Sequence, residues 1–386
     1  MKEIKMKKYV IFAIPNFRRL KMLTGAMLLG LACLPLAAKD HDRAAHYEQI
    51  NLVADVPGVA LVTDTNLVNA WGIAASATSP FWISDNGTGK STLYAVTNDS
   101  TGLPHVHTQG LVVTIPGAGT PTGQVFDGTG SFRGDVFLFV SEDGTISGWR
   151  GALGTTAETF LTRSNAVYKG VALATTTNGP LLLAANFAEG TVDAYSTNGT
   201  NLILLSQFMD PHAPVGYAPF NVQVIGEHVF VTFARQDAAK HDDVPGEGHG
   251  LIDILNPNNG KFFRFATGKD AGGKLKEINS PWGLVVSPRG FGLHEDHLLV
   301  GNFGSGTIMS FEANGEFGGL LKSTNHAPVV IDGLWALRFG NGGNGGDTNT
   351  LYFTAGPGGE SHGLFGSLTP APKREHGHDH DDEDDD

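Results

Sequence analysis

Residues 298–311 read LLVGNFGSGTIMSF: an apolar run, a short Asn/Gly turn and a second apolar run. The same plan recurs five more times along the chain, at intervals of about 45 to 60 residues. The other copies are FWISDNGTGKSTLYAV (81–96), FLFVSEDGTISGW (137–149), LLLAANFAEGTVDAY (181–195), HVFVTFAR…GHGLIDI (228–254) and LYFTAGPGGESHGLFGSL (351–368). A period of this size built from short strands is typical of a β-propeller, in which each repeat forms one four-stranded blade.

The repeats therefore predict an all-β, six-bladed propeller, with five or seven blades as alternatives. We name the strands of a blade A to D from the central channel outward. A strands are expected at 70–75, 122–126, 169–174, 220–225, 282–287 and 334–339, and D strands at 106–115, 157–163, 202–208, 261–266 and 315–321. The last repeat has no D strand after Ser367, while YEQINLVAD (47–55) precedes the first repeat without a blade of its own. We expect 47–55 to complete the sixth blade, because an open ring would leave unpaired strand edges.

The N-terminus has the features of an export signal. Seven Lys or Arg residues precede or begin the apolar run MLTGAMLLGLACLPLAA (22–38), and charge resumes at Lys39. This predicts a signal peptide over 1–38, a linker over 39–46, the propeller over 47–369 and a disordered His/acidic tail over 370–386. The expected location is secreted or periplasmic, with a lipid anchor at Cys33 as the alternative and no transmembrane span in the mature chain.

The charge balance limits the partners. Without residues 1–38 the chain keeps 19 basic and 38 acidic residues. Such a surface repels nucleic acid and anionic lipid. We expect a monomer whose partner is a small molecule, a glycan or a protein. The tail could hold Zn²⁺, Ni²⁺ or Ca²⁺ loosely, or could act only as a solubilising end.

Familiar catalytic motifs are missing. The sequence has no G-x-S-x-G elbow, and His294 and His297 are too close together for the H-E-x-x-H zinc motif. Cys33, the one cysteine, falls within the predicted signal.

Polar residues instead gather on one face of the expected ring. In a propeller the starts of the A strands and the B–C turns open on the same side, whereas the A–B turns open on the other. The predicted ligand-binding face comprises Asp85, Asn86, Glu142, Lys169, Asn186, Arg235, His249 and Asn302. The alternative is that many of these Asn and Asp residues bond their own backbone in turns.

Four of the strand A starts suggest a metal site: Asn69, Asn221, Asn279 and Asp332. Amide and carboxylate oxygens converging near the axis are ligands of the kind that Ca²⁺ accepts. The alternative is that they cap strand ends or bind channel water. The long, charged turn ARQDAAKHDDVPGEGHG (234–250) in the fourth repeat is either a lid or binding arm, or a neutral insertion.

Several strings together resemble an uncharacterised family of exported bacterial six-bladed propeller proteins, some of which carry PEP-CTERM sorting tails. They are NLVNAWGIA (66–74), FWISDNGTG (81–89), SEDGTISGW (141–149), YKGVALA (168–174), APFNVQV (218–224), PWGLVVSP (281–288), LLVGNFGSGTI (298–308), DGLWALRFGNG (332–342) and LYFTAGP (351–357). The resemblance covers about residues 50–368 and implies no established activity. Because this chain ends in a His/acidic tail, sorting by the PEP-CTERM route is not expected.

The leading hypothesis is a secreted or periplasmic propeller that binds a ligand or partner at the channel mouth. The first alternative is a calcium-dependent hydrolase similar to six-bladed lactonases, which hold calcium at that mouth, with Glu360 or His362 as the base. The second alternative is a cell-surface structural module.

Overall fold

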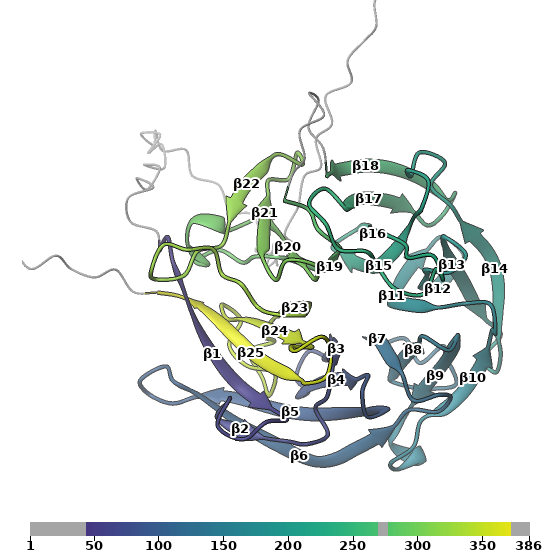
Figure 1. Cartoon of the computed structure of the whole chain (residues 1–386). Helices are drawn as coiled ribbons and strands as arrows, with labels where there is room; N and C mark the ends of the chain where they lie inside the picture. The colour runs from purple at the N-terminus through teal and green to yellow at the C-terminus, as the bar shows by residue number, and fades with distance from the viewer. Residues whose placement is uncertain (1–43, 269–276, 372–386) are drawn as a thin grey trace, which may run out of the picture.

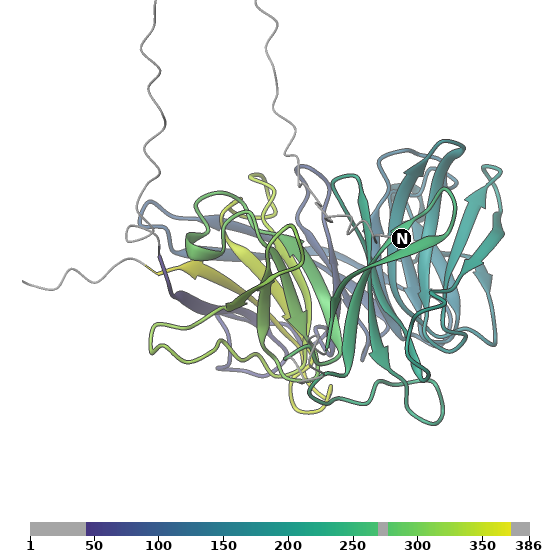
Figure 2. The same ribbon diagram turned by 90° about the horizontal axis from the view of Figure 1, so that it is seen from above.

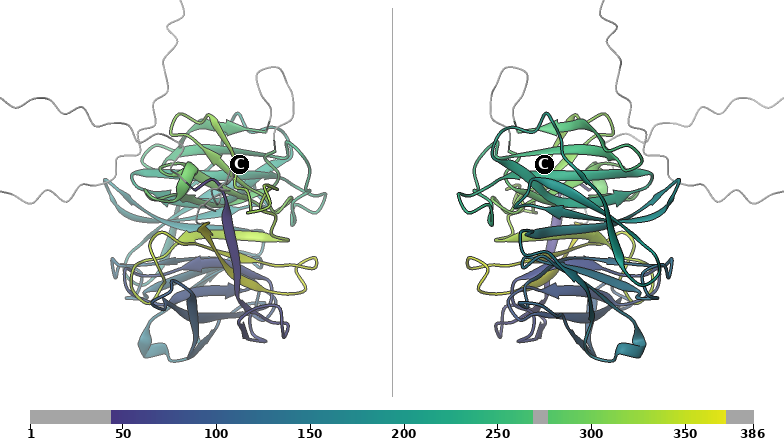
Figure 3. Two further views of the ribbon diagram at one scale, coloured as in Figure 1. Left: turned by 90° about the vertical axis from the view of Figure 1, so that its left-hand side faces the viewer. Right: turned by 90° about the vertical axis from the view of Figure 1, so that its right-hand side faces the viewer.

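The computed structural model describes residues 44–268 and 277–371. The predicted signal peptide, Cys33, most of the linker and nearly all of the tail lie outside the described residues. Within them the chain forms six β-sheets arranged as blades around a central axis (Figure 1). Figures 2 and 3 show the same ring from the side, with the strands running between its two faces. The prediction of an all-β, six-bladed propeller is confirmed.

Five blades each use four consecutive strands, in the order expected from the repeats. Blade one contains β3 (Ala70–Ala74), β4 (Phe81–Asp85), β5 (Lys90–Asn98) and β6 (Pro104–Thr114). Blade two contains β7 (Pro121–Phe126), β8 (Phe137–Ser141), β9 (Thr145–Trp149) and β10 (Glu158–Thr162). Blade three contains β11 (Tyr168–Thr176), β12 (Gly179–Asn186), β13 (Thr191–Thr197) and β14 (Leu202–Phe208).

Blade four contains β15 (Tyr217–Ile225), β16 (His228–Arg235), β17 (Gly250–Asn256) and β18 (Lys261–Thr267). Blade five contains β19 (Pro281–Val286), β20 (Leu298–Asn302), β21 (Ile308–Phe311) and β22 (Phe317–Leu320). The helical elements of the described residues are two 3-10 turns, η2 (Gly151–Leu153) and η3 (Gly292–His294). No helix in the described ranges is long and apolar enough to cross a membrane.

Blade six joins the two ends of the chain. It contains β23 (Leu334–Phe339), β24 (Leu351–Ala355) and β25 (Leu364–Pro370), and its fourth strand is β1 (Tyr47–Ala54). The β1 strand runs antiparallel to β25, with Tyr47 opposite Pro370 and Ala54 opposite Leu364. The two strands lie side by side in Figure 1. A short strand, β2 (Val62–Thr63), adds a parallel pairing at the outer edge of β1. Ring closure by the N-terminal strand is therefore confirmed.

The inner strands approach one another closely around the axis. A Cβ atom on Gly72 would lie 2.5 Å from the carbonyl oxygen of Thr122 in the next blade. A Cβ on Gly123 would lie 2.7 Å from the amide nitrogen of Val171, one blade further on. Only glycine lets two backbones meet at such separations, so these residues set how narrow the channel is.

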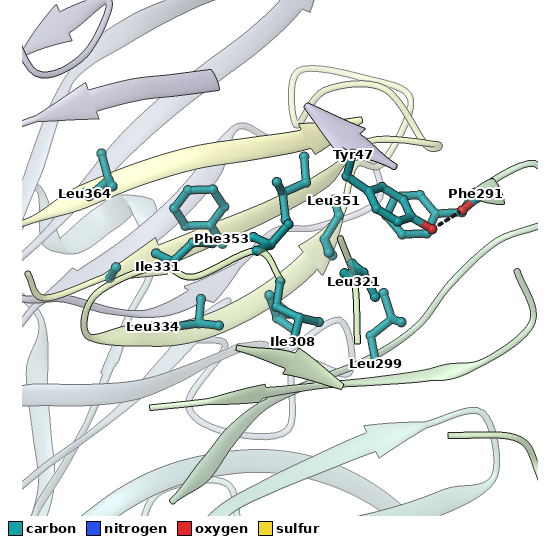
Figure 4. Packing of buried hydrophobic residues seen from close by; sticks show 14 of the residues in the cluster. Tyr47, Phe291, Leu299, Ile308, Leu321, Ile331, Leu334, Leu351, Phe353 and Leu364 are labelled. Atoms are coloured by element: carbon teal, nitrogen blue, oxygen red, sulfur yellow. Dashed lines mark hydrogen bonds between the residues drawn. The ribbon is translucent and has the colours of Figure 1, made fainter. Parts of the chain in front are cut away.

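Apolar side chains fill the spaces between blades. Figure 4 shows the cluster between blades five and six, where Leu299 and Ile308 face Leu351 and Phe353. Tyr47, from the closing strand β1, packs against Phe291 with ring centroids 4.8 Å apart. Its hydroxyl donates a hydrogen bond of 2.8 Å to the Phe291 carbonyl (Figure 4). The closing strand is therefore held by buried packing as well as by its ladder of hydrogen bonds.

We expect Tyr47→Ala to destabilise the protein by about 3 to 5 kcal/mol, because it empties a fully buried aromatic position. Tyr47→Phe, which removes only the hydroxyl, should cost about 1 kcal/mol. Urea unfolding of both variants checks this. A loss below about 1 kcal/mol for Tyr47→Ala would show that the start of β1 contributes little to closure.

Candidate functional site at the channel mouth

Five of the residues singled out in the sequence meet at one mouth of the channel. Asn69, at the start of β3, donates through Nδ2 to Glu360 Oε2 at 2.7 Å and to Asn86 Oδ1 at 3.2 Å. Asn86 donates in turn to Glu142 Oε2 at 3.0 Å. Glu142 accepts a hydrogen bond from Lys169 Nζ. Strand starts and B–C turns of blades one, two, three and six thus form one polar network.

Lys169 is the centre of this network. Its side chain is only 2% exposed, and its ammonium also donates to Asp242 Oδ1 at 3.1 Å. The ammonium lies 5.2 Å from the centroid of the Trp71 ring, which adds a cation–π contact. A buried lysine is tolerated here because two carboxylates and an aromatic face replace its water.

The long loop of blade four supplies Asp242. This loop connects β16 to β17, and it is fixed by backbone hydrogen bonds of 2.8 Å from Asp237 to Asp242 and from Val244 to Arg235. His241 Nδ1 lies 2.9 Å from Asp242 Oδ1. The loop therefore brings its carboxylate across to Lys169 of blade three, so it forms part of the mouth.

Burial and mutual repulsion shift the carboxyl groups of the mouth. Burial raises the pKa of Glu360, and the charges of Glu142 and Asp242 add to this against the hydrogen bond from Asn69. Burial also raises the pKa of Asp243, the neighbour of Asp242. For Asp242 burial is outweighed by Lys169 and His241, and its pKa is lowered.

The same balance keeps Lys169 charged. Burial alone would lower the pKa of Lys169, but Glu142 and Asp242 outweigh it and hold the pKa above its ordinary value. A permanently protonated lysine donates hydrogen bonds and supplies charge; it is not a nucleophile at neutral pH. Glu142 and Asp242 bond to this ammonium, and Asp243 and Glu360 lie near enough for its charge to lower the pKa of each.

Aromatic side chains close the channel beneath the network. Trp335 stacks on Trp71 with centroids 3.6 Å apart and on Phe303 at 3.9 Å. Its indole nitrogen donates to Asn69 Oδ1 at 2.9 Å. The Trp282 indole donates to the Lys169 carbonyl at 3.0 Å. The mouth is therefore a shallow polar site on an apolar layer.

The other predicted face residues form hydrogen bonds to partners outside this network. Asn186 donates to Glu189 and Asp193, and Asn302 donates to the Glu277 carbonyl and Thr307. Asp85 is fully buried and accepts from Thr92, and burial raises its pKa well above the ordinary range. Arg235 Nη1 lies 3.3 Å from His249 Nε2, and His249 Nδ1 lies 2.8 Å from the Val244 carbonyl. His362 contacts Asp55 beyond the end of β1. Some of these contacts lie within one turn, as for Asn186 with Glu189, and others join distant segments, as for His362 with Asp55.

The four side chains of the predicted calcium set bond to separate partners. Asn69 joins the mouth network, whereas Asn221 Nδ2 donates to the Trp282 carbonyl at 2.8 Å. Asn279 Oδ1 accepts from the Gly246 amide at 2.7 Å, and Asp332 Oδ2 accepts from the Gly358 amide at 2.8 Å. Among the described residues no hydrogen bond joins any two of the four. Equivalent positions in the repeats have thus acquired different local roles.

A different set of metal-ligand atoms does come together. One oxygen or nitrogen each from Glu142, His241 and Asp242 lies within 4.8 Å of the other two. Glu142 was predicted from the sequence as a residue of the ligand-binding face, whereas His241 and Asp242 were not. The only sequence feature that pointed to His241 and Asp242 was the length and charge of the 234–250 turn. It did not indicate which residues of the turn would lie near the axis.

Comparison with curated proteins finds viral relatives. The uncharacterized protein R648 of Acanthamoeba polyphaga mimivirus is 29% identical over 345 residues, which cover 84% of this chain and 81% of that protein. The uncharacterized protein L690 of the same virus is 28% identical over 337 residues, covering 82% and 84%. No protein-family profile matches the chain. The relatives support kinship with uncharacterised proteins, and they do not support the bacterial and exported character that the resemblance implied.

Solved structures give only distant similarity. A streptogramin B lyase has a TM-score of 0.45 and 12% identity, covering 84% of this chain and 98% of that one. A protein of carbohydrate-active enzyme family AA12 from Trichoderma reesei has a TM-score of 0.49 and 13% identity, covering 85% and 97%. At these TM-scores and identities, the similarity carries no inference about the activity or substrate of this protein.

We expect Lys169→Met to destabilise the protein by about 3 to 5 kcal/mol, since it leaves the Glu142 carboxylate buried without its cation. The double variant Lys169→Met/Glu142→Gln should recover much of that loss. Asp242→Asn is the control, because this carboxylate is 66% exposed and its pairing contributes at most about 1 kcal/mol. Equal losses in the single and double variants would contradict the pairing of Lys169 with Glu142 as the source of the effect.

Proposed function

We propose that the protein is a ligand-binding propeller that holds a cation, in the first place a divalent metal ion, at the mouth defined by Glu142, His241, Asp242 and Glu360. The observation that carries the proposal is the excess of carboxyl groups over the single ammonium of Lys169. The pKa of Glu360 is raised mainly by burial, and the charges of Glu142 and Asp242 raise it further.

The donor set fits a metal ion that accepts oxygen and imidazole ligands. Glu142 and Asp242 offer carboxylate oxygens, and His241 offers a ring nitrogen close to both. Zn²⁺ accepts both types of ligand, while Ca²⁺ prefers the oxygens. Lys169 already neutralises part of the charge, so an incoming ion would share Glu142 and Asp242 with it. The lactonase-like alternative places calcium at the four strand A residues, and there each of the four side chains has its own hydrogen-bond partner.

The test is thermal unfolding of the full chain with Ca²⁺ or Zn²⁺. Binding should raise the free energy of unfolding by RT ln(1 + [L]/Kd), about 2.7 kcal/mol when the ion is at 100 times its Kd. Asp242→Asn/Glu360→Gln should reduce this shift markedly. Glu312→Gln/Glu316→Gln, which removes two carboxylates from the exposed turn between β21 and β22, is the matched control and should not.

The His/acidic segment 376–386 is present in every variant, so differences between variants report the mouth alone. The shift should shrink as the pH falls through the raised pKa of Glu360, because a protonated carboxyl is a poor ligand. A shift that is absent at millimolar ion, or equal in all variants, would overturn the cation site.

We also propose that the protein is exported, as residues 1–38 indicate. The support is the basic segment and the apolar run 22–38. Protein recovered from the periplasm or medium of an expressing bacterium should begin near residue 39 on N-terminal sequencing. Recovery solely from the cytoplasm with residues 1–38 intact would contradict export.

A further inference from the structure

The half of the channel below the aromatic layer is hollow. Two adjoining cavities of about 220 Å³ and about 270 Å³ lie toward the A–B turns. The inner strands of all six blades line the first cavity. The two cavities share the lining residues Ile73, Gln124, Val171, Gln223, Val224 and Arg338. They form a chamber on the opposite side of the channel from the Lys169 network.

Arg338 is the one ionisable residue among the described residues that line this chamber. Its Nη2 donates to the Ala75 carbonyl at 3.0 Å, which is its one hydrogen bond to the described residues. Its Nε is buried and has no partner. No described carboxylate pairs with it, and burial alone lowers the pKa of its guanidinium. Because an arginine stays charged even so, the chamber contains an unbalanced positive charge.

Arg338 is half-buried, and removing a guanidinium from water without a counterion is costly. The free edge of the Arg338 fork can offer two parallel N–H groups to a carboxylate. The two glutamine side chains in the lining differ in whether their amide groups already form hydrogen bonds. Gln124 already donates to the carbonyls of Gly72 and Trp82, whereas the Gln223 side chain has no hydrogen bond to a described residue. Gln223 is therefore available as one further donor.

Most of the other lining side chains are aliphatic, among them Ile73, Val171, Val224, Leu284 and Ala336, and they stand beside Asn221, Trp282 and Phe126 and beside exposed backbone groups of the inner strands. A ligand that fits would carry one negative charge at one end and a short hydrocarbon body at the other. A phosphate dianion would leave one charge without a cation, because Arg338 is the one cationic side chain in the described lining. Each of the two cavities is by itself smaller than a pocket for a drug-sized ligand, so a ligand that occupies one of them beside Arg338 is small.

We propose that this lower chamber, centred on Arg338, binds a small aliphatic monocarboxylate. The carboxylate bonds to the guanidinium of Arg338 with the help of Gln223, and the hydrocarbon packs against the aliphatic walls. This site is separate from the proposed cation site, and neither proposal depends on the other.

The experiment is calorimetric titration of the full chain with butyrate at constant ionic strength. Phosphate and butyramide, the uncharged analogue of butyrate, are titrated in parallel. We expect saturable butyrate binding, with butyramide and phosphate each at least about tenfold weaker, since a charge-assisted bidentate bond contributes about that factor or more. Arg338→Met should weaken butyrate at least about tenfold, and Arg338→Lys, which keeps the charge but not the fork, should give an intermediate value.

Arg289→Met is the matched control, because it removes a guanidinium that is 80% exposed on the surface. It should leave butyrate affinity unchanged. Arg338→Met removes a charge that has no carboxylate partner, so it should fold, as circular dichroism will show. If Arg338→Met does not fold, Arg338→Lys alone decides, because unchanged affinity there would overturn a bidentate site. Absence of saturable butyrate binding, phosphate binding tighter than butyrate, or equal affinity in wild type and Arg338→Met would also overturn the proposal.

Discussion

The close approach of the six inner strands determines most of this structure. Gly72 and Gly123 let neighbouring A strands meet backbone to backbone, with no room for a Cβ atom. A channel that narrow can be closed by a few large side chains, and Trp71, Trp335 and Phe303 stack across it. This aromatic layer lies between the Lys169 network and the lower chamber, so each end of the channel has its own set of charged side chains. The two candidate sites exist as distinct sites for this reason.

The two ends carry opposite charges. At the B–C mouth several carboxyl groups lie near the one ammonium of Lys169, and burial, with a smaller contribution from Glu142 and Asp242, raises the pKa of Glu360. In the lower chamber the guanidinium of Arg338 has no carboxylate to balance it. In both places the imbalance lies in a region partly removed from water, where uncompensated charge costs most. Apolar residues at these positions would stabilise the fold at least as well. We therefore infer that the unbalanced charges at the mouth and in the chamber are there to bind ligands.

The sequence predicted the fold far better than the sites. Six repeats and an orphan strand were enough to place the blades and the closing strand, because strand period and strand pairing are local or repeated signals. The rule that A-strand starts and B–C turns share a face brought together Asn69, Asn86, Glu142 and Lys169. The same rule could not distinguish these residues from Asn221, Asn279 and Asp332. A polar residue at the same position of a repeat can either bond to local backbone groups or join the network at the mouth. The roles of Asp242 and Arg338 could not be predicted from the sequence. The position of Asp242 depends on the path of a loop that is not repeated in the other blades. The importance of Arg338 depends on its lack of a carboxylate partner, which only the structure shows.

Ring closure and the two sites meet at the interface between blades one and six. Asn69 of blade one bonds to Glu360 of blade six, and Trp71 stacks on Trp335 across the same interface. On the other side of the aromatic layer Arg338 of blade six bonds to the Ala75 carbonyl of blade one. The ring also depends here on β1, which completes blade six by pairing with β25 and whose chain continues through β2 into β3 of blade one. A ligand at either end must therefore favour the closed ring, because opening this interface would separate residues that build its site. The contacts between blades one and six therefore contribute both to the stability of the closed ring and to the affinity for a ligand at either end.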